Sequence, residues 1–370
     1  MPIKLSIGSA VYNIGEEQLR RHIESILHQL TGEVELLLID DCSTDNSGEI
    51  CREYESANEH VRYVNMGKNG GLSRVRNRTI KEALGEWIFF ADGDDVLSKY
   101  FVRNALSYCN EKYDMIIHDR RIFHNVMNEA ETAPKDLCLL ELPKTAGRDI
   151  SVSCLCMRPL DGDRYGMSKN AYYHAAWGAV YRRDFLETNN LRFPEGQKKA
   201  QDSVFNTYAY YYAESIAYLP YTMYYYRKDM QGITERYNKG FTETALSLIS
   251  HHKECMDRLY PNDPDIYTKY ERYRLISLSV DSMKLNFCHK NNPKPKDVRR
   301  REFLEFIDTE PFKHAIKHYD SDSAWWGWRI PISLAKSKRF DALDFLYKHQ
   351  ILFMLYGKTD SILRKIIKHR

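Results

Sequence analysis

An acidic cluster follows directly on an apolar run in the stretch Trp87-Ile88-Phe89-Phe90-Ala91-Asp92-Gly93-Asp94-Asp95. The apolar run has the length of a strand and is typical of a strand that is covered on both faces. Gly93 lets the backbone bend tightly, and two carboxylates one residue apart, Asp92 and Asp94, can together hold a hard divalent cation. A solvated turn that ends a strand is the alternative interpretation. The stretch therefore predicts a buried strand that ends in a metal site or in an exposed turn.

Strand and helix patterns alternate ahead of this stretch. The strand-like runs are residues 3–7, 34–39 and 61–64, and apolar residues recur at helical spacing within residues 19–30, 50–54 and 72–84. This alternation predicts an α/β fold with a mainly parallel sheet that is covered by helices on both faces. Ligands of such sheets bind beyond the carboxyl ends of the strands, where Asp40, Asp41 and the acidic cluster fall.

The pattern is weaker after a further strand-like run at residues 115–117. Residues 129–147 contain Pro134, Pro143 and Gly147 and are expected to form a loop or a flap. Short elements are expected at residues 177–181 and 218–226, and the pattern is mostly helical from about residue 237 to the end.

The charge of the chain is small and unevenly distributed. The formal net charge of +3 is too low to predict nucleic-acid binding, so we expect no nucleic-acid partner. Residues 331–370 carry nine Lys or Arg against three Asp, so the basic character belongs to the C-terminal tail. The final apolar residues, from Ile362 to Ile367, share a helical face opposite basic residues. This pattern fits an interfacial helix on anionic lipid as well as it fits a helix packed on its own domain with a solvated basic face.

Cysteine usage and the N-terminus both point to the cytoplasm. The eight Cys residues include no C-x-x-C pair and no compact framework, as expected for reduced thiols. The chain begins with a strand-like run rather than a secretion signal, and no run approaches the length of a membrane span. We therefore expect a cytoplasmic protein, with a peripheral position at the inner face of the cell membrane left open by the basic tail.

Four motifs in order carry a resemblance to a known family. They are Ala10-Val11-Tyr12-Asn13, Leu38-Ile39-Asp40-Asp41-Cys42-Ser43-Thr44-Asp45, Lys68-Asn69-Gly70-Gly71-Leu72-Ser73-Arg74-Val75-Arg76-Asn77 and Phe90-Ala91-Asp92-Gly93-Asp94-Asp95. A second block, at residues 177–184, 193–196 and 201–205, extends the likeness to about residue 240. The sequence thereby resembles an inverting family 2 glycosyltransferase of the GT-A fold, of the kind that builds bacterial surface glycans.

The resemblance implies a fold and a division of the chain. The fold is a Rossmann-like, mixed but mainly parallel sheet flanked by helices, with a mostly α-helical C-terminal extension. Residues 1–115 would form the nucleotide-sugar-binding half, residues 116–240 the acceptor-binding and catalytic half, and residues 241–370 a helical region with a basic tail.

The resemblance also implies the donor site. The nucleotide-sugar-binding residues would be Ala10, Tyr12, Asn13, Asp41, Asn69, Arg74, Arg76, Asp92, Gly93 and Asp94, with Mn²⁺ or Mg²⁺ held by Asp92 and Asp94. A carboxylate such as Asp41 can accept a hydrogen bond from the imide N–H of uracil, which favours a UDP-sugar, although dTDP shares that edge. Arg74 and Arg76 lie near a predicted helix start, where they could meet phosphate or form ordinary surface charge. For Tyr12, the alternative role is that of a packed loop aromatic.

The catalytic base of the family matches Asp202. Gln201 stands before it where Glu is more usual in the family, which would preserve hydrogen bonding but remove a charge. A helix N-cap is the alternative role for Asp202. His118 and His174 are available as a third metal ligand, but a lone His is more often structural.

The predicted function is metal-dependent, inverting transfer of a hexosyl or N-acetylhexosaminyl group. The donor would be a nucleotide sugar, with a UDP-sugar favoured, and the acceptor a glycan or a lipid-linked molecule in the synthesis of lipopolysaccharide or capsule. The acidic cluster also satisfies the D-x-D-x-V pattern of haloacid-dehalogenase-like phosphatases, in which Asp92 would be the nucleophile. A non-catalytic glycan- or membrane-binding protein is a third alternative, motivated by Gln201 and the basic tail.

Overall fold

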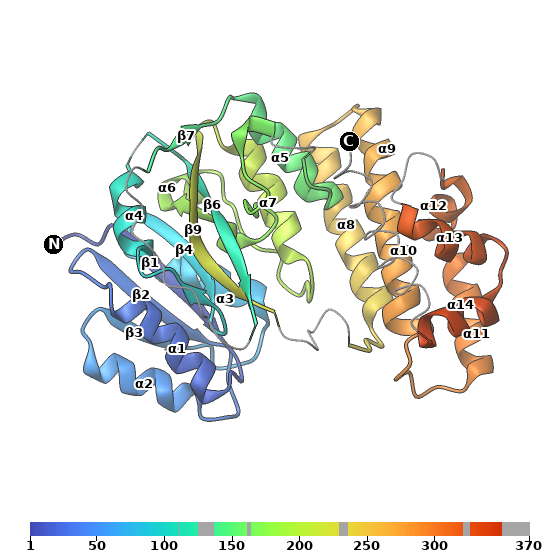
Figure 1. The fold of residues 1–370 in the computed structure, drawn as a ribbon, viewed down its shortest axis with the longest axis horizontal. Coiled ribbons are helices and arrows are strands. Elements are labelled where there is room, and N and C mark those ends of the chain that lie inside the picture. The colour runs from blue at the N-terminus through green and yellow to red at the C-terminus, as the bar shows by residue number, and fades with distance from the viewer. Residues whose placement is uncertain (111, 125–136, 161–163, 229–235, 321–325, 350–370) are drawn as a thin grey trace, which may run out of the picture. The chain divides into compact units, whose positions relative to one another are not determined.

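The computed structural model describes residues 1–110, 112–124, 137–160, 164–228, 236–320 and 326–349. The chain divides into two compact units, Met1–Met230 and Gln231–Arg370, which Figure 1 colours from blue to yellow-green and from yellow to red. None of the helices in these described ranges combines the length and the apolar character that a membrane crossing requires.

The described residues of the first unit form a single sheet of nine strands. The strands are β1 (Leu5–Val11), β2 (Val34–Asp40), β3 (Val61–Asn65), β4 (Trp87–Asp92), β5 (Val96–Leu97), β6 (Met115–Phe123), β7 (Leu140–Glu141), β8 (Ala179–Arg182) and β9 (Ile216–Arg227). Their order is β3-β2-β1-β4-β8-β6-β9-β5, and β7 pairs with β9. Both predicted halves of this unit therefore contribute strands to one sheet.

The first four strands predicted from the sequence form the parallel half of the sheet. β1 pairs in parallel with both β2 and β4, with Val11 opposite Asp40 and Ala10 opposite Asp92. The carboxyl ends of β2 and β4 therefore meet at one edge, as the alternation of strands and helices predicts. The acidic cluster and the Asp40-Asp41 pair lie at that edge.

The other half of the sheet is mixed. β8 runs antiparallel to its neighbours β4 and β6, whereas β6 and β9 are parallel. The β6–β9 register shifts on both sides of Asp119, which marks a bulge, and bulges of this kind re-aim side chains near sites.

Helices cover both faces of the sheet. They are α1 (Glu16–Leu27), α2 (Ser47–Ala57), α3 (Leu72–Glu82), α4 (Phe101–Tyr108), α5 (Thr145–Cys156), α6 (Arg183–Thr188) and α7 (Gln201–Tyr212), with the short turns η1 (Arg164–Gly166) and η2 (Ala176–Gly178). Leu36 and Phe89 pack with α1, α2 and α4, while Leu37 and Phe90 point the other way and pack with α3, α5, α6 and α7. Figure 1 shows α1 and α2 on one side of the strands and α5 and α7 on the other. Because helices cover both faces of the sheet, the strands are apolar along their length rather than alternately apolar and polar.

One part of the predicted loop is a helix. Residues 129–136 lie outside the described residues, but Gly147, read as loop material, lies inside α5. A Cβ atom at Gly147 would come within 2.6 Å of the Tyr210 carbonyl oxygen on α7. Gly147 is therefore explained by the close packing of α5 on α7 and not by a turn.

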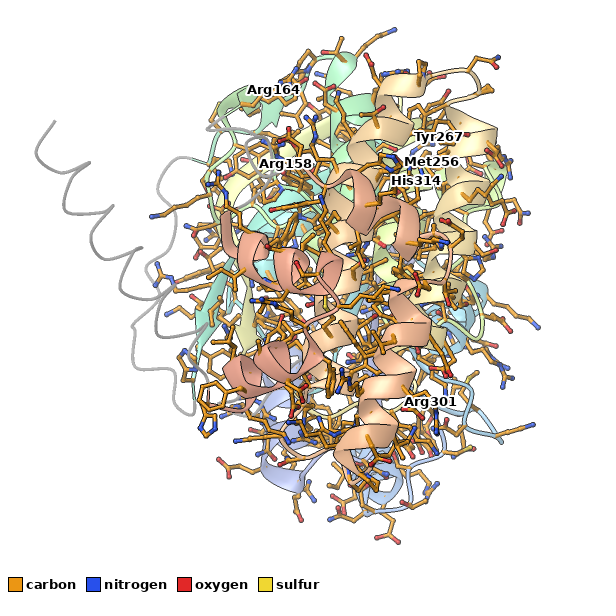
Figure 2. The ribbon with its side chains drawn as sticks, turned by 90° about the vertical axis from the view of Figure 1, so that its right-hand side faces the viewer. Arg158, Arg164, Met256, Tyr267, Arg301 and His314 are labelled. Carbon is orange, nitrogen blue, oxygen red and sulfur yellow. The ribbon has the colours of Figure 1, made fainter. Side chains whose placement is uncertain are left out.

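The second unit is helical, as predicted. It comprises α8 (Phe241–Leu259), α9 (Pro264–Tyr270), the π-helical turn η4 (Glu271–Leu275), α10 (Ile276–Ser282), the π-helical turn η5 (Met283–Phe287), α11 (Lys296–Ile307), α12 (Phe312–His318), the turn η6 (Trp326–Trp328), α13 (Arg329–Lys336) and α14 (Phe340–Lys348). Tyr267 on α9 donates a hydrogen bond to Asp257 on α8, at 2.5 Å, and Figure 2 shows Tyr267 beside Met256 of α8. Residues 350–370, on which the prediction of an interfacial basic helix falls, lie outside the described residues.

Candidate active site

Asp92 is fixed at the end of β4 by a tight backbone approach. The Gly93 N–H donates to the Ala10 carbonyl oxygen at 3.0 Å. A Cβ atom at Gly93 would come within 2.7 Å of that oxygen and within 2.6 Å of Ile14 Cδ1. A residue without a side chain is needed here, and it joins the first loop to the acidic cluster.

Arg76 connects Asp92 with Asp202. Its Nη2 donates to Asp92 Oδ1 at 3.0 Å, and its Nη1 bonds to Asp202 Oδ1. The Arg76 side chain is only 3% exposed and lies over the Phe193 ring, 5.3 Å from the centroid. Although burial disfavours its charge, the two carboxylates hold the pKa of Arg76 above its ordinary value. The structure thus brings three predicted site residues together, with Arg76 between two acids rather than in ordinary surface charge.

Asp202 lies at the start of α7, but it does not cap the helix. Ala200 occupies the N-cap position, and Asp202 Oδ2 instead accepts the Ala176 N–H at 3.1 Å. The N-cap alternative is therefore wrong. Burial raises the pKa of Asp202, and the neighbouring Arg76 lowers it in part. A carboxylate with a raised pKa and a fixed orientation is suited to general-base chemistry.

Gln201, which precedes Asp202 in the chain, is buried. It is 7% exposed, and among the described residues no donor reaches its Oε1. An ionised Glu at this position would place a further negative charge in the same buried segment as Asp202, at a cost in desolvation and repulsion.

Asp95, the third acid of the cluster, is buried and bonded to residues of β9. It is 1% exposed and accepts hydrogen bonds from the Tyr224 hydroxyl at 2.6 Å and the Arg227 N–H at 2.7 Å. Burial, followed by the charges of Asp94 and Asp92, raises its pKa. Asp95 therefore anchors the cluster to β9, and the next helix, α4, begins only at Phe101.

Asp41 binds the Gly-Gly turn. Its two carboxylate oxygens accept the N–H groups of Gly70 at 2.8 Å and Gly71 at 2.7 Å, and Asn69 donates to its carbonyl oxygen at 3.1 Å. Each carboxylate oxygen has a second lone pair, so a base N–H can still be accepted. Recognition of the base by Asp41 stays a prediction.

The first loop exposes Tyr12 and anchors Asn13. Tyr12 is 49% exposed, so it is not a packed aromatic here. Asn13 Oδ1 accepts the Thr44 N–H at 2.7 Å, and the Asn13 N–H donates to Ser43 Oγ at 3.0 Å. Asn13 therefore holds the first loop against the loop that follows β2, and Tyr12 is available to a ligand.

Arg74 differs from Arg76 in its surroundings. Its side chain is 37% exposed, and its Nε lies 3.9 Å from Glu195 Oε2, which is long for an ion pair. Of the two arginines, Arg74 is thus the one that can turn toward a phosphate.

Asp92 and Asp94 fit a divalent cation as two ligands of an incomplete shell. Their side chains are 26% and 46% exposed, and Arg227 Nη2 lies 3.9 Å from Asp94 Oδ2. Within the described residues there is no group of three or more metal-binding side chains. Mg²⁺ commonly takes one or two carboxylates together with substrate phosphates and water, so this donor set suits a cation that arrives with a diphosphate.

Within the described residues, His118 and His174 do not form a metal-binding group with Asp92 and Asp94. His118 is buried against the rings of Phe89 and Phe101, and burial lowers its pKa to about 4. His174 is buried and bonded to Ser153 Oγ at 3.1 Å.

The sequence did not predict that the stacked rings of Tyr224 and Trp177 would lie next to Asp92 and Asp202. The Tyr224 hydroxyl accepts the Asp92 N–H at 3.1 Å, and the Tyr224 ring stacks on Trp177 with centroids 4.8 Å apart. Trp177 follows Ala176, which binds Asp202. The excess of Tyr in residues 218–226 was visible in the sequence, but it did not indicate which rings face the site.

Comparison with known proteins agrees with this geometry. Residues 6–187 match the family described as Glycosyl transferase family 2. The chain is 28% identical to EpsH of Bacillus subtilis, a protein named as a glycosyltransferase, over 80% of this chain and 79% of EpsH. It is 24% identical to the poly(ribitol-phosphate) beta-N-acetylglucosaminyltransferase TarS of Staphylococcus aureus, over 92% of this chain and 51% of TarS.

The same fold occurs in a solved structure. The crystal structure of TarS residues 1–349 in complex with UDP-GlcNAc superposes with a TM-score of 0.59 at 19% identity, over 94% of this chain and 91% of that chain. The predicted GT-A fold is thereby confirmed. The chain is a glycosyltransferase with a GT-A fold, and its residues 6–187 match glycosyl transferase family 2.

Proposed function

We propose that this glycosyltransferase transfers a sugar, with inversion, from a UDP-sugar to a hydroxyl group of a surface glycan or its lipid-linked precursor. The observation that carries the proposal is the Arg76 bridge, which places Asp202 from α7 next to Asp92 at the end of β4. The family assignment replaces the alternative of a phosphatase with Asp92 as nucleophile.

The chain's residues divide the chemistry between donor and acceptor. Tyr12, Asp41 and Asn69 bind the nucleoside, and Asp92 and Asp94 hold the divalent cation. When bound, that cation neutralises charge on the diphosphate leaving group. Asp202 accepts the proton of the acceptor hydroxyl as the oxygen attacks the anomeric carbon. One displacement inverts the configuration.

The relatives support the choice of donor and acceptor class. TarS is solved with UDP-GlcNAc, which favours a UDP-N-acetylhexosamine here. TarS is also named for action on poly(ribitol-phosphate), a polymer with many hydroxyl groups. A hydroxyl-rich surface polymer is accordingly the acceptor class that we propose.

Donor turnover tests this function directly. The purified chain is incubated with a panel of nucleotide sugars, with and without Mn²⁺ or Mg²⁺, and release of the nucleoside diphosphate is followed. Asp202→Asn should bind the donor but lose turnover, whereas Asp92→Asn and Asp94→Asn should weaken metal-dependent donor binding. Asp184→Asn, at a side chain that is 81% exposed, is the matched control. Absence of binding to any nucleotide sugar would refute the proposal, and so would unchanged activity of all three variants.

We also propose a peripheral position at the cytoplasmic face of the membrane. The proposal rests on the basic composition of residues 331–370. Flotation with anionic liposomes is compared for the full chain and a chain that lacks these residues. Equal flotation of both chains would remove this proposal and leave the glycosyltransferase untouched.

A further inference from the structure

Arg120 on β6 presents a half-buried guanidinium against aromatic rings. Its Cζ lies 3.9 Å from the centroid of the Tyr172 ring, 5.7 Å from that of Trp177 and 5.8 Å from that of Tyr226. Arginine stacks on aromatic faces in this way while its N–H donors remain directed to the edge of the plane. The rings thus hold the guanidinium in one orientation without using its donors.

Arg120 has no acidic partner in the part of the chain that the structure describes. The adjacent Asp119 accepts instead from Ser168 Oγ at 2.8 Å and from the Tyr218 hydroxyl at 2.7 Å. Asp95, the acid of the cluster whose charge acts on Arg120, accepts hydrogen bonds from the Tyr224 hydroxyl and the Arg227 N–H. No side-chain hydrogen bond or ion pair joins the Arg120 guanidinium to another described residue. Burial lowers the pKa of Arg120, as expected for a cation without a compensating charge.

The rings that contact Arg120 lie next to residues that bind Asp92 and Asp202. Trp177 stacks on Tyr224, at an interplanar angle of 10°, and the Tyr224 hydroxyl contacts the Asp92 N–H. Trp177 also follows Ala176, whose N–H binds Asp202. A ligand group at Arg120 would therefore lie close to the proposed base.

The sheet order places Arg120 on the acceptor side. The donor loops follow β1, β2 and β4, whereas β6 and β9 lie beyond β8 on the other side of β4. The register shift at Asp119 comes immediately before Arg120, where a bulge can turn a side chain toward a site. A diphosphate held by Asp92 and Asp94 would thus bind at a different part of the sheet from the part that carries Arg120.

We propose that Arg120, seated on Tyr172, Trp177 and Tyr226, binds a phosphate group of the acceptor next to the hydroxyl that Asp202 deprotonates. A planar guanidinium with free N–H donors can bind two phosphate oxygens at once. The enzyme would then select acceptors that carry a phosphate near the reacting hydroxyl. This inference rests on the proposed function, because Asp202 as base defines where the acceptor lies.

Phosphate binding to the UDP-loaded protein tests the subsite. The full chain is saturated with UDP and Mg²⁺ so that the donor diphosphate site is filled, and inorganic phosphate is titrated by ³¹P NMR. Wild type should bind phosphate, and Arg120→Gln should weaken that binding by about tenfold or more, because charge-assisted hydrogen bonds are lost. Arg120→Lys, which keeps the charge but not the fork, should fall between them.

Two comparisons separate the outcomes. Arg121→Gln, at the exposed next residue of β6, should leave phosphate binding unchanged. Ribitol 5-phosphate should bind more tightly than ribitol to wild type and lose that advantage in Arg120→Gln, if the phosphate belongs to an organic acceptor rather than to the free ion. If only inorganic phosphate shows the effect, the acceptor assignment is overturned.

The proposal fails if UDP-loaded wild type binds no phosphate, or if Arg120→Gln binds it equally well. It also fails if Arg120→Gln weakens UDP binding itself, because Arg120 would then serve the donor. A wild-type chain that binds neither UDP nor any nucleotide sugar would instead refute the proposed function, so the two failures are distinguishable.

Discussion

At the residue scale, Arg76 is the group on which the site's electrostatics depend. The carboxylates of Asp92 and Asp202, which lie far apart in the chain, meet at one buried cation, the guanidinium of Arg76. Without that cation, Asp92 and Asp202 would repel each other in a partly desolvated setting. Loss of Arg76 should therefore change both the stability of the first unit and the pKa of Asp202.

Arg76→Gln should destabilise the first unit. Removing one member of a buried ion pair leaves uncompensated charge, but Asp92 and Asp202 are 26% and 18% exposed, so water relieves part of the cost. We expect a loss of roughly 1–3 kcal/mol in the free energy of unfolding, measured by denaturant titration. Arg74→Gln is the matched control and should change stability little. Equal stability of both variants would contradict the bridging role.

The pH dependence of turnover should report Asp202. The base must be deprotonated, so kcat/KM falls as the pH drops through the pKa of Asp202. Because burial raises that pKa, the fall should begin at a higher pH than for an ordinary Asp, whose pKa is about 4. Arg76 lowers the pKa, so Arg76→Gln should move the acid limb to still higher pH, and Arg74→Gln should not. An acid limb that stays in place in Arg76→Gln would show that Arg76 does not tune the base.

The residue types of the site were predictable, but their contacts were not. The carboxylates of Asp92, Asp94 and Asp202 are recognisable because their motifs are local in sequence. The Arg76 bridge, the anchoring of Asp95 to β9 and the burial of Gln201 depend on segments that are distant in the chain. No pattern within a single segment carries that information.

At the element scale, the junction of β1 with the end of β4 is sensitive to a single methyl group. In Gly93→Ala the new Cβ would meet the Ala10 carbonyl oxygen, which is backbone and cannot turn away. We expect a loss of about 1–3 kcal/mol in stability and weaker donor binding, since Asp92 and Asp94 would shift.

A suitable control is Gly32→Ala, where a Cβ meets nothing closer than 3.7 Å. Thermal unfolding and UDP titration of both variants check the prediction. If Gly93→Ala and Gly32→Ala gave the same result in both measurements, the close approach of Gly93 to the Ala10 carbonyl oxygen would matter neither for stability nor for donor binding.

Sequence periodicity predicted the arrangement of the parallel half of the sheet. For the other half it predicted short elements at residues 115–117, 177–181 and 218–226, but not how they pair. Strands β1 to β4 alternate with helices, so each element is signalled locally and the carboxyl ends follow from the topology. β8 is short and lies antiparallel between β4 and β6, a position that depends on pairing between distant segments. Gly147 was wrongly predicted to lie in a loop, because a sequence does not distinguish a glycine that permits close helix packing from a glycine that permits a turn.

At the scale of the whole molecule, each unit has a buried arginine of its own. In the second unit Arg299 binds Asp344 through two hydrogen bonds, at 2.5 and 3.2 Å, and also donates to the Phe287 carbonyl oxygen at 2.8 Å. Both side chains are at most 5% exposed. This pair joins α11 to α14 inside the helical unit, just as Arg76 joins α3 to α7 inside the first.

Asp344→Asn should loosen the second unit and leave the donor site intact. Loss of the buried negative charge leaves the Arg299 cation uncompensated, which costs roughly 3 kcal/mol, so amides of α11 and α14 should exchange with solvent about a hundredfold faster. Hydrogen exchange followed by mass spectrometry measures this segment by segment, and UDP titration measures the first unit.

Asp341→Asn, on the same helix with a side chain that is 55% exposed, removes only surface ion pairs with Lys296 and Arg300 and should change neither measurement. Every residue of the proposed donor site belongs to Met1–Met230, so we expect UDP binding to be unchanged in Asp344→Asn. Weaker UDP binding in Asp344→Asn, with Asp341→Asn unchanged, would mean that the helical unit supports donor binding and that the two units function as one.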